Sequence, residues 1–121
     1  MARILVIDDE APVRNMIRQT LEREGYEVAD AGDGRQGMAQ LRRQPVDLVI
    51  TDILMPEQEG IETIRMLRKE FPQIKILAIS GGGKTGKLDI LPVAQTFGAH
   101  RTLAKPFDRK DLLAAVSALV S

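Results

Sequence analysis

The feature that most limits the fold of this chain is a recurrence of short apolar runs rich in β-branched residues. Three such runs occupy residues 4–7, 47–51 and 74–79. Nearly continuous apolar runs of this length are typical of strands buried on both faces of a parallel sheet. Two weaker and more mixed runs, at 26–29 and 99–103, predict strands nearer the edges of that sheet.

Amphipathic segments separate the apolar runs. Over residues 13–21 the apolar side chains recur at helical spacing, which predicts a helix that begins with Pro12 at its first position. Residues 34–43 and 60–70 predict two further helices. A last apolar stripe near the C-terminus predicts a helix that Asp108 can cap.

The stretch after the run at 74–79 is the least regular part of the chain. Residues 81–88 predict a long glycine-rich loop, followed by a helix with Asp89 as its cap and Pro92 in its first turn. The loop matches the spacing of a phosphate-binding P-loop, but Leu88 stands where that motif needs a hydroxyl group. Five strand–helix units result. The sequence therefore predicts an α/β fold, a doubly wound five-stranded parallel sheet with helices on both faces.

Composition excludes several classes of protein. A length of 121 residues is typical of one domain, and 17 basic residues balance 17 acidic ones, whereas a nucleic-acid binder normally shows a basic excess. No stretch approaches the roughly 20 apolar residues of a membrane helix. The N-terminus does not resemble a signal peptide, and cysteine is absent. We therefore expect a cytoplasmic protein without direct nucleic-acid binding or membrane insertion.

Polar residues gather where the predicted strands end. Asp8, Asp9 and Glu10 follow the first strand, and Asp52, Ser80 and Lys105 end the third, fourth and fifth. In doubly wound sheets the ligand site lies at these carboxyl ends, so we expect the side chains to converge. Converging carboxylates repel unless a cation joins them, and Mg²⁺ is the hard cation that prefers carboxylate oxygens and shares its remaining positions with phosphate.

This set of groups suits phosphoryl transfer. Lys105 supplies a mobile positive charge and Ser80 a hydrogen-bond donor, and both can neutralise the charge that spreads over phosphoryl oxygens. A carboxylate is the available nucleophile, and its product would be an acyl phosphate. His100, the only histidine, begins the predicted fifth strand away from this rim and is expected at the surface.

Four motifs follow one another in the chain. They are Val6-Ile7-Asp8-Asp9-Glu10, the segment 47–56 with Gly60, Ile79-Ser80-Gly81, and Lys105-Pro106-Phe107. In these motifs the chain resembles a two-component response-regulator receiver domain of the single-domain, chemotaxis-regulator kind. The resemblance covers the whole chain, 1–121, as one receiver domain.

The resemblance implies a role for each acidic residue. Asp52 corresponds to the phosphoacceptor. Asp8 and Asp9, together with Asp52, correspond to the Mg²⁺ ligands, and the backbone carbonyl of Leu54 is a further ligand. The implied fold is flavodoxin-like, with strand order 2-1-3-4-5.

The resemblance also assigns the remaining groups of the rim. Ser80 corresponds to the switch hydroxyl, and Lys105 contacts the phosphoryl group from a strand end whose bond to Pro106 is expected to be cis. The family usually has an aromatic residue three positions before the lysine, where this chain has Thr102. We therefore expect a switch that does not use the flip of an aromatic side chain.

The implied function is a phosphorelay switch. Such a domain accepts a phosphoryl group from a sensor histidine kinase or a phosphotransfer protein, and phosphorylation changes the surface that a downstream protein binds. It assists its own phosphorylation and dephosphorylation but is not a turnover enzyme. One alternative is an aspartyl-phosphate phosphohydrolase, although such enzymes typically carry a second acid two residues after the nucleophile, where this chain has Leu54. A flavin-binding module of the same fold is a weaker alternative, because no aromatic residue flanks the predicted site.

Overall fold

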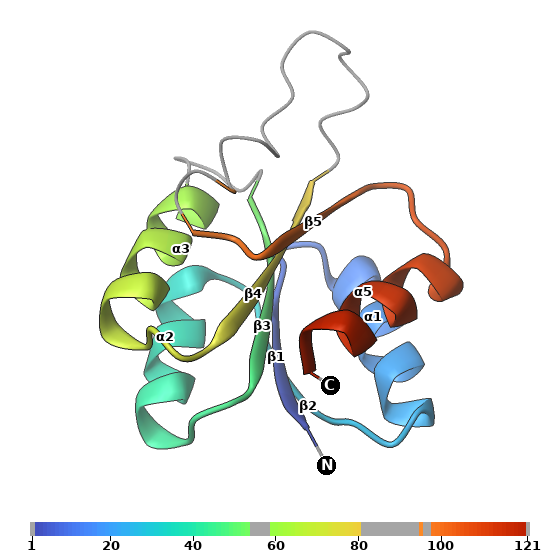
Figure 1. The fold of residues 1–121 in the computed structure, drawn as a ribbon, viewed down its shortest axis with the longest axis horizontal. Coiled ribbons are helices and arrows are strands. Elements are labelled where there is room, and N and C mark those ends of the chain that lie inside the picture. The colour runs from blue at the N-terminus through green and yellow to red at the C-terminus, as the bar shows by residue number, and fades with distance from the viewer. Residues whose placement is uncertain (1, 54–58, 81–94, 96–97, 121) are drawn as a thin grey trace, which may run out of the picture.

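A computed structural model of the chain describes residues 2–53, 59–80, 95 and 98–120. Its centre is a five-stranded parallel sheet with the strand order β2-β1-β3-β4-β5 (Figure 1). The strands are β1 (Arg3–Ile7), β2 (Glu27–Ala31), β3 (Leu48–Asp52), β4 (Lys75–Ser80) and β5 (Arg101–Ala104). The predicted α/β fold class and the strand order 2-1-3-4-5 are confirmed.

The two mixed runs do form the edge strands, as predicted, but their bounds differ from the expected ones. β5 begins at Arg101, two residues later than the run at 99–103 predicts. Gly98 has a φ of 128°, so the chain is still turning toward the sheet just before that run. Half-buried edge strands carry a weak apolar pattern, and their ends are therefore set by tertiary pairing.

Helices cover both faces of the sheet. They are α1 (Ala11–Arg23), α2 (Gly34–Arg43), α3 (Glu59–Glu70) and α5 (Arg109–Val120). In Figure 1, α1 and α5 lie on one face and α2 and α3 on the other. The segment that contains Asp89 and Pro92, for which a further helix is predicted, lies outside the described residues.

The helix ends are close to those predicted. α2 spans residues 34–43 as expected, and the Asp33 carboxylate caps it by accepting the Gln36 backbone N–H at 2.8 Å. Asp108 caps α5 through the Asp111 N–H at 2.8 Å, which confirms its predicted role. Pro12 is the second residue of α1 and not the first. Either position suits proline, because the first N–H groups of a helix have no partner within it.

The core is divided in two by the sheet. Alternate residues of β1 point to opposite faces, so Leu5 and Ile7 pack with α2 and α3, whereas Ile4 and Val6 pack with α1 and α5. All four side chains are at most 1% exposed. Burial on both faces is the reason why the central strands show continuous apolar runs. Among the described residues, no helix has the length and hydropathy needed to cross a membrane.

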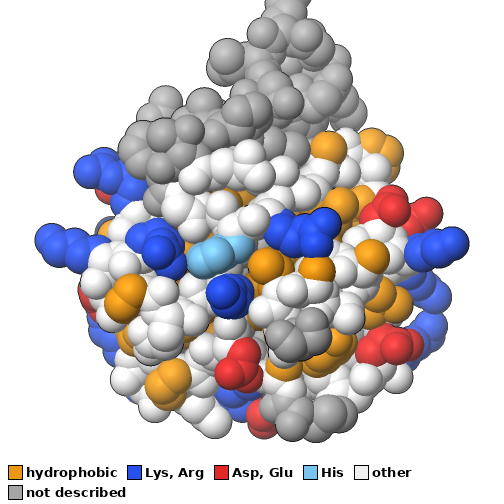
Figure 2. Space-filling model, viewed as in Figure 1, with side chains coloured by type: hydrophobic (Ala, Val, Ile, Leu, Met, Phe, Trp, Pro, Cys, Tyr) orange, Lys and Arg blue, Asp and Glu red, His pale blue; other side chains and the backbone are white. Residues whose placement is uncertain are grey.

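His100 lies just before the first residue pair of β4 and β5 and forms hydrogen bonds with Ile76. Its Nδ1 accepts the Ile76 backbone N–H at 3.0 Å, and its own N–H donates to the Ile76 carbonyl at 2.9 Å. The residue is exposed, as expected, and Figure 2 shows the imidazole among Lys and Arg side chains. Partial burial, Arg68 and Lys75 lower the pKa of His100, so the ring remains neutral and keeps Nδ1 as an acceptor.

Replacing His100 by Gln is expected to flatten the rise of stability with pH between about pH 5 and pH 7.5. In this range the unfolded chain, with an ordinary histidine pKa of about 6.5, binds a proton that the folded chain resists, so the parent loses stability as pH falls. One proton changes the free energy of unfolding by at most about 1.4 kcal/mol per pH unit. Urea unfolding curves of both proteins measure the difference. Equal slopes would contradict the prediction.

Candidate functional site at the carboxyl edge of the sheet

Four predicted residues lie at the carboxyl edge of the sheet. Asp8 directly follows β1, Asp52 ends β3 and Ser80 ends β4, and these three are at most 2% exposed. The backbone N–H of Lys105, directly after β5, donates to the Ser80 carbonyl at 2.7 Å. The Lys105–Pro106 peptide bond is cis, as expected. Parallel pairing thus brings together residues that are up to 97 positions apart.

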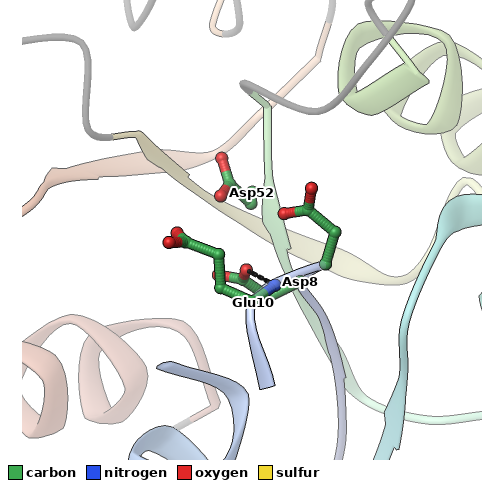
Figure 3. A group of neighbouring side chains, drawn as sticks. Asp8, Glu10 and Asp52 are labelled. Atoms are coloured by element: carbon green, nitrogen blue, oxygen red, sulfur yellow. Dashed lines mark hydrogen bonds between the residues drawn. The ribbon is translucent and has the colours of Figure 1, made fainter. Parts of the chain in front are cut away.

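Acidic side chains form a compact cluster at this edge. One carboxylate oxygen from each of Asp8, Asp9, Glu10 and Asp52 lies within 4.8 Å of the others. In Figure 3 the Asp8 and Glu10 side chains rise from the end of β1 beside Asp52. Asp8 and Asp52 are buried, whereas Asp9 and Glu10 are exposed, so the cluster has a buried inner side and an open outer side. The structure therefore brings the predicted acids together.

Lys105 ties three of these carboxylates to one another. Its Nζ donates to Asp52 Oδ2 at 2.8 Å, to Glu10 Oε1 at 3.0 Å and to Asp8 Oδ2 at 3.2 Å. Its side chain is only 16% exposed. Burial lowers the pKa of Lys105, but the hydrogen bonds to Asp52 and Glu10 and the charges of Asp52 and Asp8 outweigh burial and raise the pKa well above its ordinary value. The ammonium is therefore always charged at neutral pH.

The ionised form of the buried Asp8 carboxylate is only partly stabilised by Lys105. Burial raises the pKa of Asp8, and the nearby charge of Asp52 raises it further. The Glu10 backbone N–H, which donates to Asp8 Oδ1 at 2.8 Å, and Lys105 lower the pKa, but the net shift is upward. The ionised form is thus costly in this position. A second cation among these oxygens would relieve that cost.

Two residues of the site were missed by the sequence analysis. The run of three acids after the first strand places Glu10 at the strand end, but the resemblance gives it no role. Arg14, on α1, donates from Nη1 to the Asp8 carbonyl oxygen at 2.6 Å. Its Nε lies 3.6 Å from Asp30 Oδ2. No local pattern marks Arg14, because its partners are reached only through the fold.

Gly60 allows α3 to begin against the end of β3. A Cβ atom at this position would lie 2.5 Å from the Asp52 carbonyl oxygen and closer still to Ile53 Cα. Both neighbours are backbone atoms, which cannot move aside by changing a rotamer. The glycine of the second motif therefore has a steric role in placing the Asp52 backbone.

The donor set fits a hard divalent cation. All the groups are carboxylate oxygens, which Mg²⁺ prefers, and no histidine or cysteine lies among them. Asp8, Asp9 and Asp52 are the expected ligands, and Glu10 offers a further oxygen on the open side. The expected ligand at the Leu54 carbonyl lies outside the described residues.

Comparisons with known proteins agree with this arrangement. Residues 4–117 match the model of the response regulator receiver domain. A probable transcriptional regulatory protein of Picosynechococcus sp. is 41% identical over 98% of this chain and 49% of its own length. The CAI-1 autoinducer sensor kinase/phosphatase CqsS of Vibrio cholerae is 37% identical over 98% of this chain and 17% of its own length. The chain thus spans about half of the first relative and a smaller part of the second.

A solved structure confirms the architecture over nearly the full length of both chains. The chemotaxis response regulator CheY4 of Vibrio cholerae superposes with a TM-score of 0.86 at 29% identity, covering 98% of each chain. The family match spans the four strand ends that carry the acidic cluster and Lys105. The chain belongs to the response regulator receiver domain family of two-component signalling proteins.

Proposed function

We propose that this chain accepts a phosphoryl group on Asp52 and acts as a phosphorelay switch in the cytoplasm. The observation that carries the proposal is the position of Asp52. Asp52 is 2% exposed, and its carboxylate lies 2.8 Å from the Lys105 ammonium and belongs to a cluster of four acids. The proposed unit is one receiver domain over residues 1–121, with a sensor histidine kinase or a phosphotransfer protein as donor and a downstream protein as target.

The transfer step uses groups at the sheet edge. An Asp52 carboxylate oxygen attacks phosphorus, and the P–N bond to the donor imidazole breaks as the new P–O bond forms. Lys105 stabilises the negative charge on the phosphoryl oxygens, and the Ser80 hydroxyl, at the end of the adjacent strand, donates a hydrogen bond to one of them. Asp8, Asp9, Asp52 and the Leu54 carbonyl would hold Mg²⁺, which would supply positive charge to offset the negative charge of the transfer step.

The product differs from the starting site in charge and in volume. A phosphoryl group adds about −1.5 to −2 charges and three acceptor oxygens. Lys105 then has a stronger partner than the Glu10 carboxylate, which lies on the open side of the cluster. Movement of Lys105 toward the phosphoryl group would release Glu10 and change the surface near the end of β5. The switch does not need an aromatic side chain at Thr102.

Incubation with Mg²⁺ and a small acyl phosphate tests the proposal. Intact mass is expected to rise by one phosphoryl group per chain, and a chelator such as EDTA is expected to prevent the change, because the carboxylates are then left without a divalent cation. Unchanged mass in the presence of Mg²⁺ would overturn the proposal. Sustained turnover of a phosphomonoester without stoichiometric labelling would favour the phosphohydrolase alternative.

A further inference from the structure

Of the three carboxylates that accept hydrogen bonds from Lys105 Nζ, only that of Glu10 is exposed. The side chains of Asp8 and Asp52 are 0% and 4% exposed, whereas that of Glu10 is 61% exposed. Glu10 Oε1 nevertheless lies 3.0 Å from Nζ, closer than Asp8 Oδ2 at 3.2 Å. The ammonium therefore has two buried partners and one partner at the boundary with solvent.

The backbone of Glu10 is held in place, but its side chain has no part in forming the helix that follows. Glu10 is the N-cap residue of α1, and its carbonyl accepts the Arg14 N–H at 3.0 Å. Its own N–H donates to Asp8 Oδ1, the hydrogen bond drawn as a dashed line in Figure 3. The side chain makes no capping hydrogen bond. Within the described part of the chain, the carboxylate of Glu10 bonds to Lys105 alone.

The three N–H groups of the Lys105 ammonium are all in use. A lysine ammonium donates three hydrogen bonds, and the three carboxylates accept one each. A phosphoryl oxygen can therefore accept from Lys105 only if it displaces a carboxylate oxygen. The displaced group then needs another source of hydrogen bonds.

Glu10 is the carboxylate that can leave. Asp52 would itself carry the phosphoryl group, and Asp8 is buried, so its carboxylate cannot exchange Lys105 for water without a large desolvation cost. The exposed Glu10 side chain can rotate into solvent, where hydration replaces the hydrogen bond to Lys105. Its separation from Asp52 in the cluster is at most 4.8 Å between carboxylate oxygens, so the charge of a phosphoryl group on Asp52 would also repel it.

We propose that Glu10 competes with the phosphoryl group for Lys105 and thereby sets how readily Asp52 is phosphorylated. This inference rests on the proposed function and adds a residue that opposes it. The hydrogen bond between Glu10 and Lys105 stabilises the unphosphorylated chain and is lost in the phosphorylated one. An ion pair at the solvent boundary is expected to shift that balance by about two- to fivefold.

Titration of the full chain with beryllofluoride at saturating Mg²⁺ tests the proposal. This anion is a noncovalent analogue of a phosphoryl group on a carboxylate, and fluorine NMR measures its dissociation constant. E10Q keeps the size of the side chain and removes its charge, and it is expected to bind beryllofluoride about two- to fivefold more tightly than the parent. A residue that only supports the fold would weaken binding when replaced. Equal or weaker binding by E10Q would therefore overturn the proposal.

E10D separates the hydrogen bond from the charge. Aspartate keeps the charge, but it is shorter by one methylene group, and at an N-cap its carboxylate is favoured to accept a backbone N–H of the helix. Both effects draw it away from Lys105, so E10D is also expected to bind beryllofluoride more tightly than the parent. E22Q is the matched control, because Glu22 lies on α1 and pairs with Arg18 at 3.2 Å. Binding by E10D like the parent, or tighter binding by E22Q, would overturn the proposal.

Two further measurements keep this inference apart from the proposed function. At a limiting concentration of a small acyl phosphate, E10Q is expected to reach a larger labelled fraction than the parent by intact mass. A parent that is labelled and binds beryllofluoride, while E10Q only equals it, would overturn the role of Glu10 and leave the proposed function standing. A parent that does neither would overturn both.

A titration of the unphosphorylated chains with Mg²⁺, followed by amide NMR, tests the competing role of Glu10 as a metal ligand. E10Q is expected to keep most of the Mg²⁺ affinity of the parent, because the carboxylate of Glu10 is assigned to Lys105. A loss of affinity on the order of tenfold or more would identify Glu10 as a group that holds the cation and would overturn the proposal.

Discussion

Asp52→Asn is expected to abolish the phosphoryl increment that the parent chain gains from a small acyl phosphate with Mg²⁺. Asparagine has nearly the same shape as aspartate, but its amide has no anionic oxygen to attack phosphorus. The substitution also removes one negative charge from the proposed metal site. Both effects act on the same step, so no residual labelling is expected by intact mass.

The fold of this variant is expected to survive. The amide oxygen of Asn can still accept from Lys105 Nζ, which lies 2.8 Å from Asp52 Oδ2, and loss of the charge relieves the repulsion that raises the pKa of Asp8. D47N is the matched control, because Asp47 directly precedes β3 and lies at the other end of that strand. It is expected to label like the parent. Labelling that persists in D52N would mean that Asp52 is not the acceptor.

Lys105→Met is expected to destabilise the chain strongly in the presence of a chelator. Lys105 Nζ lies within 3.2 Å of three carboxylates, and two of them, those of Asp8 and Asp52, are almost completely buried. Methionine keeps much of the side-chain volume but leaves these charges uncompensated. Loss of one partner of a buried ion pair costs about 3–5 kcal/mol, and the open side of this cluster reduces the expected loss to about 2–4 kcal/mol. Thermal unfolding should therefore shift downward by on the order of 10 °C.

Mg²⁺ is expected to restore more stability to K105M than it adds to the parent. Without the ammonium the carboxylates bind a divalent cation more tightly, and a ligand that binds only the folded state stabilises it by RT ln(1 + [L]/Kd), which grows as Kd falls. Thermal unfolding with EDTA and with Mg²⁺ measures both effects. K110M, the same change at an exposed position in the first turn of α5, is the control. An equal loss of stability in K110M and K105M would rule out charge compensation as the cause.

The sequence predicted the sheet well because the pattern of its central strands is strong. Runs such as Ile4 to Ile7 are buried on both faces, and burial of this kind leaves few polar residues to confuse the pattern. The edge strands were located less accurately. β5 has exposed residues at both ends, Arg101 and Ala104, so its ends depend on the register with β4, which is a tertiary property.

The acids and the lysine of the candidate site were also predicted, since their positions depend on topology more than on fine packing. Residues that follow parallel strands meet at one edge whatever their exact rotamers. Glu10 and Arg14 were not assigned because their contributions depend on single contacts: a carboxylate oxygen 3.0 Å from Lys105 Nζ, and a guanidinium 2.6 Å from the Asp8 carbonyl. No periodicity in the sequence encodes such contacts.

The sequence alone determined which groups this protein can bring to the carboxyl edge of its sheet, because the order of strands and the residues after them follow from local patterns. Only the tertiary structure decided which of these charged groups contact one another and at what distance. It showed one ammonium hydrogen-bonded to three carboxylates, of which Asp8 is buried and has a raised pKa, and at the other end of β1 an Arg3 Nε without a partner. Electrostatic balance depends on distances of a few ångströms between residues far apart in the chain, and such distances are set by packing.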